Sequence, residues 1–122
     1  MGRPNLLILL ADQFRHDCAG YRGMRPVKTP NIDKLACESA VFTRAFTPLP
    51  VCAPVRQSLV NGLHPDSFGA MWNYDFFMTP TATPTKKTWP EQLGARGYRG
   101  GYVGKWHISP TFGPRDFGYT DV

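Results

Sequence analysis

The sequence predicts an α/β fold in which helices flank a mixed, mostly parallel sheet. A continuous aliphatic run close to the N-terminus is typical of a strand that is buried on both faces. Segments with helical periodicity alternate along the chain with short apolar or β-branched segments. The chain has 122 residues, 42% of them hydrophobic, which suits one domain with one modest core.

The first half is predicted to contain a strand, a long loop, a helix and a second strand. The aliphatic run at 5–11 is the buried strand, and residues 12–29 lack periodicity, as a loop does. Residues 29–39 begin with capping side chains and continue with apolar residues at helical spacing. Residues 41–46 alternate and are β-branched or aromatic, which indicates a strand. The apolar face expected for the helix consists of Ile32, Leu35 and Ala36.

The second half is predicted to contain a helix that begins near Cys52, a short helix at 89–97 and a strand at 98–104. Pro54 suits the first turn of the first helix, and a glycine lies near its end. Residues 64–88 are rich in proline, threonine and aromatics and are expected to form a long surface excursion. The apolar side expected for the first helix consists of Leu59, Val60 and Leu63.

Charge and composition argue against several classes of function. The formal net charge is +5, but the basic residues are dispersed, whereas nucleic-acid binders usually concentrate them in a stripe. A small anionic partner suits this charge better. The apolar run at 6–11 is too short to cross a bilayer, and no signal peptide is recognisable. We therefore expect no nucleic-acid partner, no membrane partner and a cytoplasmic location.

Three cysteines without a C-x-x-C pair indicate neither a disulfide framework nor a zinc site. Cys18 and Cys37 are expected to be inert, buried thiols. Cys52 differs because it lies at the start of a predicted helix, where unpaired N–H groups and the helix dipole suit an anion. Arg56 lies about one helical turn further on, so its guanidinium can return to position 52. A structural cysteine beside an unrelated arginine remains an alternative, whereas a thiolate-phosphatase loop needs a wider spacing of cysteine and arginine.

Other candidate side chains also follow predicted strands, where α/β proteins assemble their sites. Asp12 and Gln13 offer oxygen ligands to a hard cation such as calcium or magnesium, although Asp12 can equally be a loop cap. Lys105 and His107 are two residues apart, so an extended backbone would point both to one side. A surface lysine and a packed histidine are the alternative there. No role follows from the sequence for His16, Asp17 and His64.

Five blocks in order resemble the type I, formylglycine-dependent sulfatases of the alkaline-phosphatase-like superfamily. The segment C-A-P-V-R resembles the C-x-P-x-R signature of that family. R-P-N-L-L-I-L-L-A-D-Q resembles its opening strand and metal-binding turn, and T-P-N-I-D-K-L-A resembles its first helix. G-Y-V-G-K-W-H-I and F-G-Y-T-D-V resemble its G-K-W-H segment and the usual continuation. The resemblance implies the N-terminal part of an alkaline-phosphatase-like sheet flanked by helices.

The resemblance also implies a mechanism. Cys52 would be oxidised after translation to formylglycine by a formylglycine-generating enzyme, a transient partner. The aldehyde would hydrate to a diol, one hydroxyl of which attacks the sulfur of a small-molecule sulfate ester. The second hydroxyl would then lose its proton, expelling sulfate. Arg56 would hold the modified residue, Lys105 would bind the sulfate oxygens, and His107 would lie near the diol and the ester.

The same resemblance implies a divalent cation held by Asp12, Gln13 and the modified Cys52. Calcium is favoured, with magnesium or manganese as alternatives. The family often has aspartate where this chain has Gln13, a substitution that resembles choline-sulfatase-like enzymes and phosphonate monoester hydrolases. A phosphonate monoester or phosphodiester hydrolase is therefore an alternative to a sulfuric ester hydrolase. Val55 replaces the usual serine or alanine of the signature, a departure that concerns the conversion of Cys52 and not the substrate.

The chain is too short to be a whole member of this family, because members of the family are several times longer. We expect residues 1–122 to be the N-terminal portion of a sulfatase catalytic domain and the isolated chain to be inactive. A non-catalytic, anion-binding fragment or degenerate family member is a further alternative. Neither the alcohol that carries the sulfate nor the oligomeric state follows from the sequence.

Overall fold

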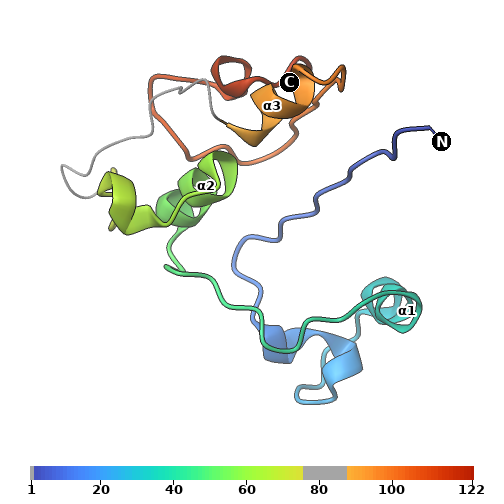
Figure 1. Cartoon of the computed structure of the whole chain (residues 1–122). Helices are drawn as coiled ribbons and strands as arrows, with labels where there is room; N and C mark the ends of the chain where they lie inside the picture. Colours follow the sequence, from blue (N-terminus) through green and yellow to red (C-terminus); the bar gives the residue numbers. More distant parts are fainter. Residues whose placement is uncertain (1, 76–87) are drawn as a thin grey trace. The chain divides into compact units, whose positions relative to one another are not determined.

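The computed structural model describes residues 2–75 and 88–122, and these divide into two compact units, Met1–Ala45 and Phe46–Val122. The first unit contains helix α1 (Pro30–Glu38), and the second contains α2 (Cys52–Asn61) and α3 (Trp89–Gly94) (Figure 1). Short 3-10 turns accompany them: η1 (His16–Cys18), η2 (Gly20–Arg22), η3 (Pro65–Phe68) and η4 (Pro114–Phe117). The three predicted helices are confirmed.

In the first unit, side chains at the start of α1 and just before it hold the turn η2. The Thr29 hydroxyl accepts a hydrogen bond from the Gly20 N–H at 2.7 Å, and the Asp33 carboxylate accepts one from the Tyr21 N–H at 2.8 Å. The apolar face predicted for α1 is not covered, because Ile32 and Leu35 are 44% and 59% exposed. Helix periodicity was therefore sufficient to predict α1, but the prediction that its apolar face is buried is wrong for the described residues.

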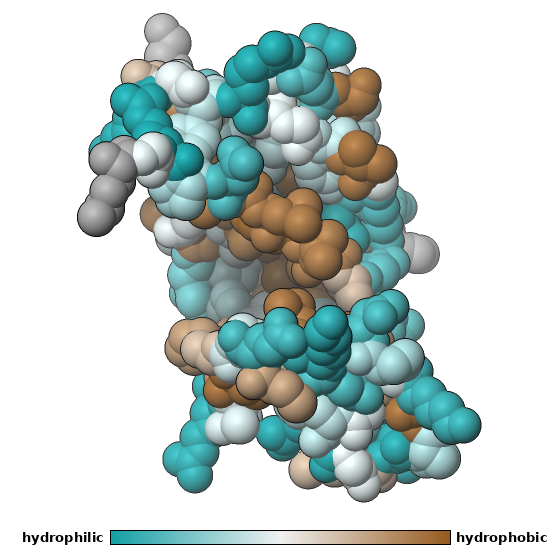
Figure 2. Space-filling view, turned by 90° about the vertical axis from the view of Figure 1, so that its right-hand side faces the viewer, coloured by the Kyte–Doolittle hydropathy of each residue, from teal (hydrophilic) through white to brown (hydrophobic). Residues whose placement is uncertain are grey.

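None of the described residues belongs to a regular strand, so the strands predicted at 5–11, 41–46 and 98–104 are not formed there. Leu7 and Leu9 are 82% and 81% exposed, and Figure 2 shows hydrophobic side chains at the surface. A buried central strand needs hydrogen-bonded neighbours on both edges and helices over both faces. The described residues supply none of these to the aliphatic run, which explains why it stays extended and uncovered.

Residues near the predicted strand 98–104 do show the start of parallel pairing. Gly101 and Asp121 form an isolated parallel bridge. The Tyr102 N–H donates to the Asp121 carbonyl and the Thr120 N–H donates to the Gly100 carbonyl, both at 2.8 Å. Two adjacent glycines carry no side chain to pack on a sheet, so the pairing does not extend into a ladder.

The core of the second unit is formed by α2 and the segments that follow α3. Phe117 is completely buried, and its ring contacts the Trp106 ring edge-on at a centroid distance of 5.2 Å. Burial also raises the pKa of Tyr119, on the same cluster, to about 12. The buried side chains of this core are Val60, Ile108 and Phe117, and Trp106, Phe112 and Tyr119 pack against them.

Among the helices of residues 2–75 and 88–122, none combines the length and the apolar character needed to cross a lipid bilayer. The cytoplasmic location stays a prediction. Cys18 is half-buried, whereas Cys37 is exposed on α1, so the prediction of a buried thiol is wrong for Cys37. The physical reason is that α1 buries none of its side chains.

Asp17 is a buried carboxylate that two arginines hold in the first unit. It is 7% exposed and accepts hydrogen bonds from Arg15 at 2.8 Å and from Arg25 at 3.0 Å. The hydrogen bond from Arg15, followed by that from Arg25, lowers the pKa of Asp17 from 3.8 to about 2. Asp17 therefore has a structural role, anchoring the loop that precedes α1.

An Asp17→Asn variant of the full-length protein is expected to have a lower thermal unfolding midpoint than the wild type at neutral pH. Because the folded pKa is lowered, the carboxylate stabilises the fold above its ordinary pKa of 3.8 and loses this effect as the pH falls toward 2. The difference between the two midpoints should therefore shrink between about pH 4 and about pH 2. A difference that stays constant across this window would contradict the role of the charge.

Candidate functional site

The site begins at the first turn of α2, where the structure places Cys52 as the first helical residue. Cys52 is half-buried. The next N–H group, that of Ala53, donates to the Asn73 Oδ1 at 2.8 Å, so a side chain from outside the helix satisfies one of its open donors. At the other end, Gly62 adopts a left-handed φ of 66° and its N–H caps the helix at the Ser58 carbonyl, 2.8 Å away. The predicted position of Cys52 at a helix start is confirmed.

The buried face of α2 is more polar than predicted. Leu59 and Leu63 are 43% and 56% exposed, so the prediction that they form a buried apolar side with Val60 is wrong for both. Arg56 and Gln57 are buried instead, with 7% and 1% exposure. The face that points inward is formed by Ala53, Pro54, Arg56, Gln57 and Val60.

The polar residues of this face can be buried because each binds a backbone carbonyl of one distant segment. The Arg56 Nη1 donates to the Lys105 carbonyl at 2.8 Å, and the Gln57 Nε2 donates to the Ile108 carbonyl at 2.8 Å. A buried donor with an acceptor avoids a cost of roughly 1–3 kcal/mol. Two consecutive residues of α2 thus hold the backbone on both sides of His107. We call these two hydrogen bonds, which join Arg56 and Gln57 of α2 to the backbone of residues 105–108, the α2 clamp.

His107 lies between the two points of the α2 clamp and has an unusual backbone. Its φ is 49°, the only positive value of a residue other than glycine in the part of the chain that the structure describes. Its Nε2 lies 2.6 Å from the Asp75 Oδ2, and its ring contacts the Tyr74 ring edge-on at 5.1 Å. Left-handed backbone in a residue with a side chain is rare and concentrates at functional sites.

Lys105 and His107 do not share one extended segment, as the sequence argument assumed. No strand is formed at 105–107, and the left-handed φ of His107 breaks the alternation of an extended chain. The Lys105 side chain is exposed, whereas the His107 side chain is 15% exposed. Arg56 contacts the backbone carbonyl of Lys105, two residues before His107. This differs from the prediction, in which the side chains of Lys105 and His107 point to one side.

Asp12 and Gln13 lie in the first unit, at a turn where the Phe14 N–H donates to the Asp12 carbonyl at 3.0 Å. Both side chains are exposed. Their carboxylate and amide oxygens suit a hard cation in kind. Within residues 2–75 and 88–122, no three His, Cys, Asp or Glu side chains gather into a metal site. These two residues therefore fit part of a cation shell and not a complete one.

His16 and His64 gain no chemical role from the structure. His16 is exposed in η1, and the His64 Nδ1 pairs with the Asp66 Oδ1 at an exposed position next to η3. The hydrogen bond from His64 lowers the pKa of Asp66. This pair resembles that of His107 and Asp75 in composition but lies on the surface.

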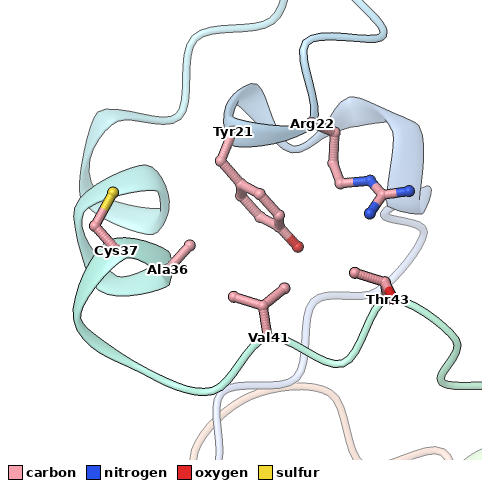
Figure 3. Close-up of a pocket in the computed structure, with 6 residues that line it drawn as sticks. All are labelled: Tyr21, Arg22, Ala36, Cys37, Val41 and Thr43. Carbon is pink, nitrogen blue, oxygen red and sulfur yellow. The ribbon is translucent and has the colours of Figure 1, made fainter.

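A pocket in the first unit has no predicted site residue in its lining. Figure 3 shows Tyr21 and Arg22 of η2 on one side, α1 on another and the following segment below. The residues that line it are Tyr21, Arg22, Ala36, Cys37, Val41 and Thr43. Because the candidate chemical groups lie elsewhere, we do not assign the site to this pocket.

Sequence reasoning missed three residues that the structure brings to the site: Asn73, Asp75 and Gln57. The first two lie in a segment that was predicted to be a surface excursion. No local pattern marks them, since their partners are 20 to 51 residues away in the chain. The buried Gln57 could have been suspected only from its place one residue after Arg56.

Comparisons with known proteins agree with the resemblance of the sequence blocks. A family model described as Sulfatase matches residues 4–119. The chain is 39% identical over 119 residues to an ulvan-active sulfatase of Formosa agariphila, covering 97% of this chain and 22% of that protein. It is 34% identical over 109 residues to human arylsulfatase A, covering 86% of this chain and 21% of that protein.

A third relative is an arylsulfatase of Clostridium perfringens, 30% identical over 115 residues, with 88% of this chain and 22% of that protein covered. The chain thus spans about a fifth of the length of the curated relatives that it matches.

Proposed function

Because the chain belongs to the sulfatase family, we propose that it carries part of the active site of a sulfuric ester hydrolase whose nucleophile derives from Cys52. The observation that supports this most directly is the α2 clamp. The helix that begins with Cys52 also fixes the backbone around His107 through Arg56 and Gln57. Because one helix carries Cys52 and binds the backbone on both sides of His107, the arrangement supports a joint role of the two residues in one site.

Members of the sulfatase family generally depend on formylglycine and a divalent cation. For this chain we propose that a formylglycine-generating enzyme converts the Cys52 side chain to an aldehyde. The carbon–sulfur bond breaks, the sulfur leaves as hydrogen sulfide, oxygen takes its place, and two electrons pass to an external acceptor such as dioxygen. Hydration gives a diol, and one of its hydroxyl oxygens forms a bond to the sulfur of the ester. The bond from sulfur to the alcohol oxygen breaks, and the alcohol leaves with a proton. The second hydroxyl then loses its proton, sulfate leaves, and the aldehyde is restored.

The other residues of the site supply charge and proton exchange. The Lys105 ammonium group is exposed and would attract the sulfate oxygens. The Arg56 guanidinium donates to the Lys105 carbonyl, and its positive charge would hold the modified residue. His107 would exchange a proton with the diol or the ester. These roles rest on the resemblance and on the local geometry of the second unit.

Asp12 and Gln13, with the modified Cys52, would hold the divalent cation, for which calcium is favoured over magnesium and manganese. Oxygen ligands of this kind suit a hard ion. When bound, such an ion lowers the pKa of an attacking hydroxyl and polarises the ester oxygens.

We place residues 1–122 in the N-terminal portion of the catalytic domain, and we propose the activity for the full-length protein. The relatives are about five times longer than the matched region. The described residues also do not gather three metal-binding side chains. The 122-residue chain alone is therefore expected to be inactive.

Turnover of an aryl sulfate and of the matching aryl phosphonate by the full-length protein tests the proposed substrate class. The relatives by name are sulfatases, so we expect a higher kcat/KM for the sulfate. Gln13 is the one feature that favours the alternative of a phosphonate monoester or phosphodiester hydrolase. A higher kcat/KM for the phosphonate would establish that alternative and contradict the proposal.

A further inference from the structure

We propose that Asp75 is a positioning residue that fixes the tautomer and the orientation of the His107 ring. This inference rests on the proposed function, since it gives His107 a part in the reaction. It concerns a residue of the segment after η3, for which the sequence predicted no role.

A short hydrogen bond joins the side chains of Asp75 and His107. The His107 Nε2 and the Asp75 Oδ2 are 2.6 Å apart. An ionised carboxylate can only accept a hydrogen bond, so the proton of this contact belongs to Nε2. In a neutral imidazole the other nitrogen, Nδ1, then carries the lone pair. Asp75 therefore selects which nitrogen of His107 is able to accept a proton.

The other nitrogen of the ring lies in a buried environment. The His107 Nδ1 is buried and has no hydrogen-bond partner among the residues that the structure describes. A buried polar atom without a partner is costly, so its presence calls for an explanation. We assign the lone pair on Nδ1 to proton exchange with a hydroxyl group of the diol or the ester, while Asp75 occupies Nε2.

Several contacts restrain the His107 ring and its backbone. Besides the hydrogen bond to Asp75, the Tyr74 ring contacts His107 edge-on, with an angle of 70° between the planes. Burial raises the pKa of Tyr74, so this phenol stays neutral beside the imidazole. The α2 clamp holds the backbone on both sides, including the left-handed φ of His107. Asp75 supplies the one restraint in this set that also determines the tautomer.

An Asp75→Asn variant of the full-length protein, assayed with an aryl sulfate, tests the proposal. Asparagine keeps the shape but can donate to Nε2, which moves the ring proton to Nδ1. We expect kcat to fall by about 10–100-fold, as for other residues that orient a functional histidine, with little change in KM. The matched control is Asp66→Asn, which removes a carboxylate from the exposed pair with His64 and should leave kcat within about two-fold.

A double-mutant cycle separates positioning from a merely structural role. If Asp75 acts through the ring, Asp75→Asn should cause no further loss in a His107→Ala background. A loss of the same size in that background would overturn the proposal, and so would a single variant with wild-type kcat. Should Asp75→Asn not fold, Asp75→Glu enters the same cycle. Asp75→Glu keeps the carboxylate but moves it relative to the ring. If it lowers kcat by the same factor with and without His107, the proposal is again overturned.

The outcomes for this inference and for the proposed function are distinct. A wild-type protein that hydrolyses aryl sulfate while Asp75→Asn is equally active refutes only the role of Asp75. A wild-type protein without sulfate-ester hydrolysis refutes the proposed function itself.

Discussion

Replacing Cys52 by alanine in the full-length protein is expected to lower kcat/KM for an aryl sulfate by about 10⁴-fold or more. The reason is that the proposed nucleophile is the hydrated aldehyde made from this side chain, and alanine can form neither thiol nor aldehyde. The thermal unfolding midpoint should change little, because Cys52 is half-buried at a helix start and its side chain fills no core position. Steady-state kinetics and thermal unfolding together check both parts.

The matched control for this experiment is Cys37→Ala. Cys37 is an exposed thiol on α1 in the first unit and has no part in the proposed chemistry. Its removal should leave kcat/KM within about two-fold of the wild type. Cys52→Ala with substantial remaining turnover, or an equal loss in Cys37→Ala, would contradict the assignment of residue 52.

The largest effect on stability is expected for Gly118→Ala. Gly118 ends η4 with a φ of 94°, and an added Cβ would lie 2.6 Å from the Glu91 Cγ and 2.7 Å from the Glu91 backbone nitrogen. Real Cβ atoms do not approach so closely, so the chain would have to move. We expect a loss of about 2–5 kcal/mol from the left-handed backbone and the overpacking together.

This region cannot relax easily, because the turn is tied to the first turn of α3. The Thr88 hydroxyl lies 3.0 Å from the Phe117 carbonyl, to which it donates, and the Thr88 N–H donates to the Glu91 carboxylate at 3.2 Å. Thr88 and Phe117 are both completely buried. A clash at Gly118 would therefore disturb the cap of α3 and the core that holds the segment with His107.

Gly62→Ala is the control that separates the two causes. Gly62 has a left-handed φ of 66°, but an added Cβ would meet nothing within 4 Å. This variant should lose only the conformational part, about 1 kcal/mol. Thermal unfolding of both variants measures the difference. A midpoint for Gly118→Ala that is no lower than that for Gly62→Ala would show that the close approach to Glu91 is absent in the protein.

Local signals were enough to predict the helices and the start of the site. Pro54 and a glycine near the helix end placed a helix at Cys52, and capping residues with helical spacing placed α1, because these features act over a few neighbouring residues. Burial was predicted less well. Leu59 was expected inside and is exposed, whereas Gln57 is buried because it has an acceptor at Ile108.

Features that depend on distant partners could not be predicted from one sequence. The aliphatic run at 5–11 has the composition of a central strand, but a strand needs neighbours, and the run itself does not specify them. The contacts of Asp75 and Asn73 likewise join residues far apart in the chain. Neither residue belongs to a block with a recognisable pattern, so only the structure reveals them.

Oxidation of the Cys52 side chain to formylglycine underlies every step of the proposed reaction, and mass spectrometry of the peptide that contains residue 52 tests it. The full-length protein should be purified from a host that has a formylglycine-generating enzyme and digested after its activity is measured. We predict a residue in which an aldehyde oxygen has replaced the thiol sulfur, with the loss of two hydrogens. An unmodified cysteine at position 52 in a fully active protein would contradict the account.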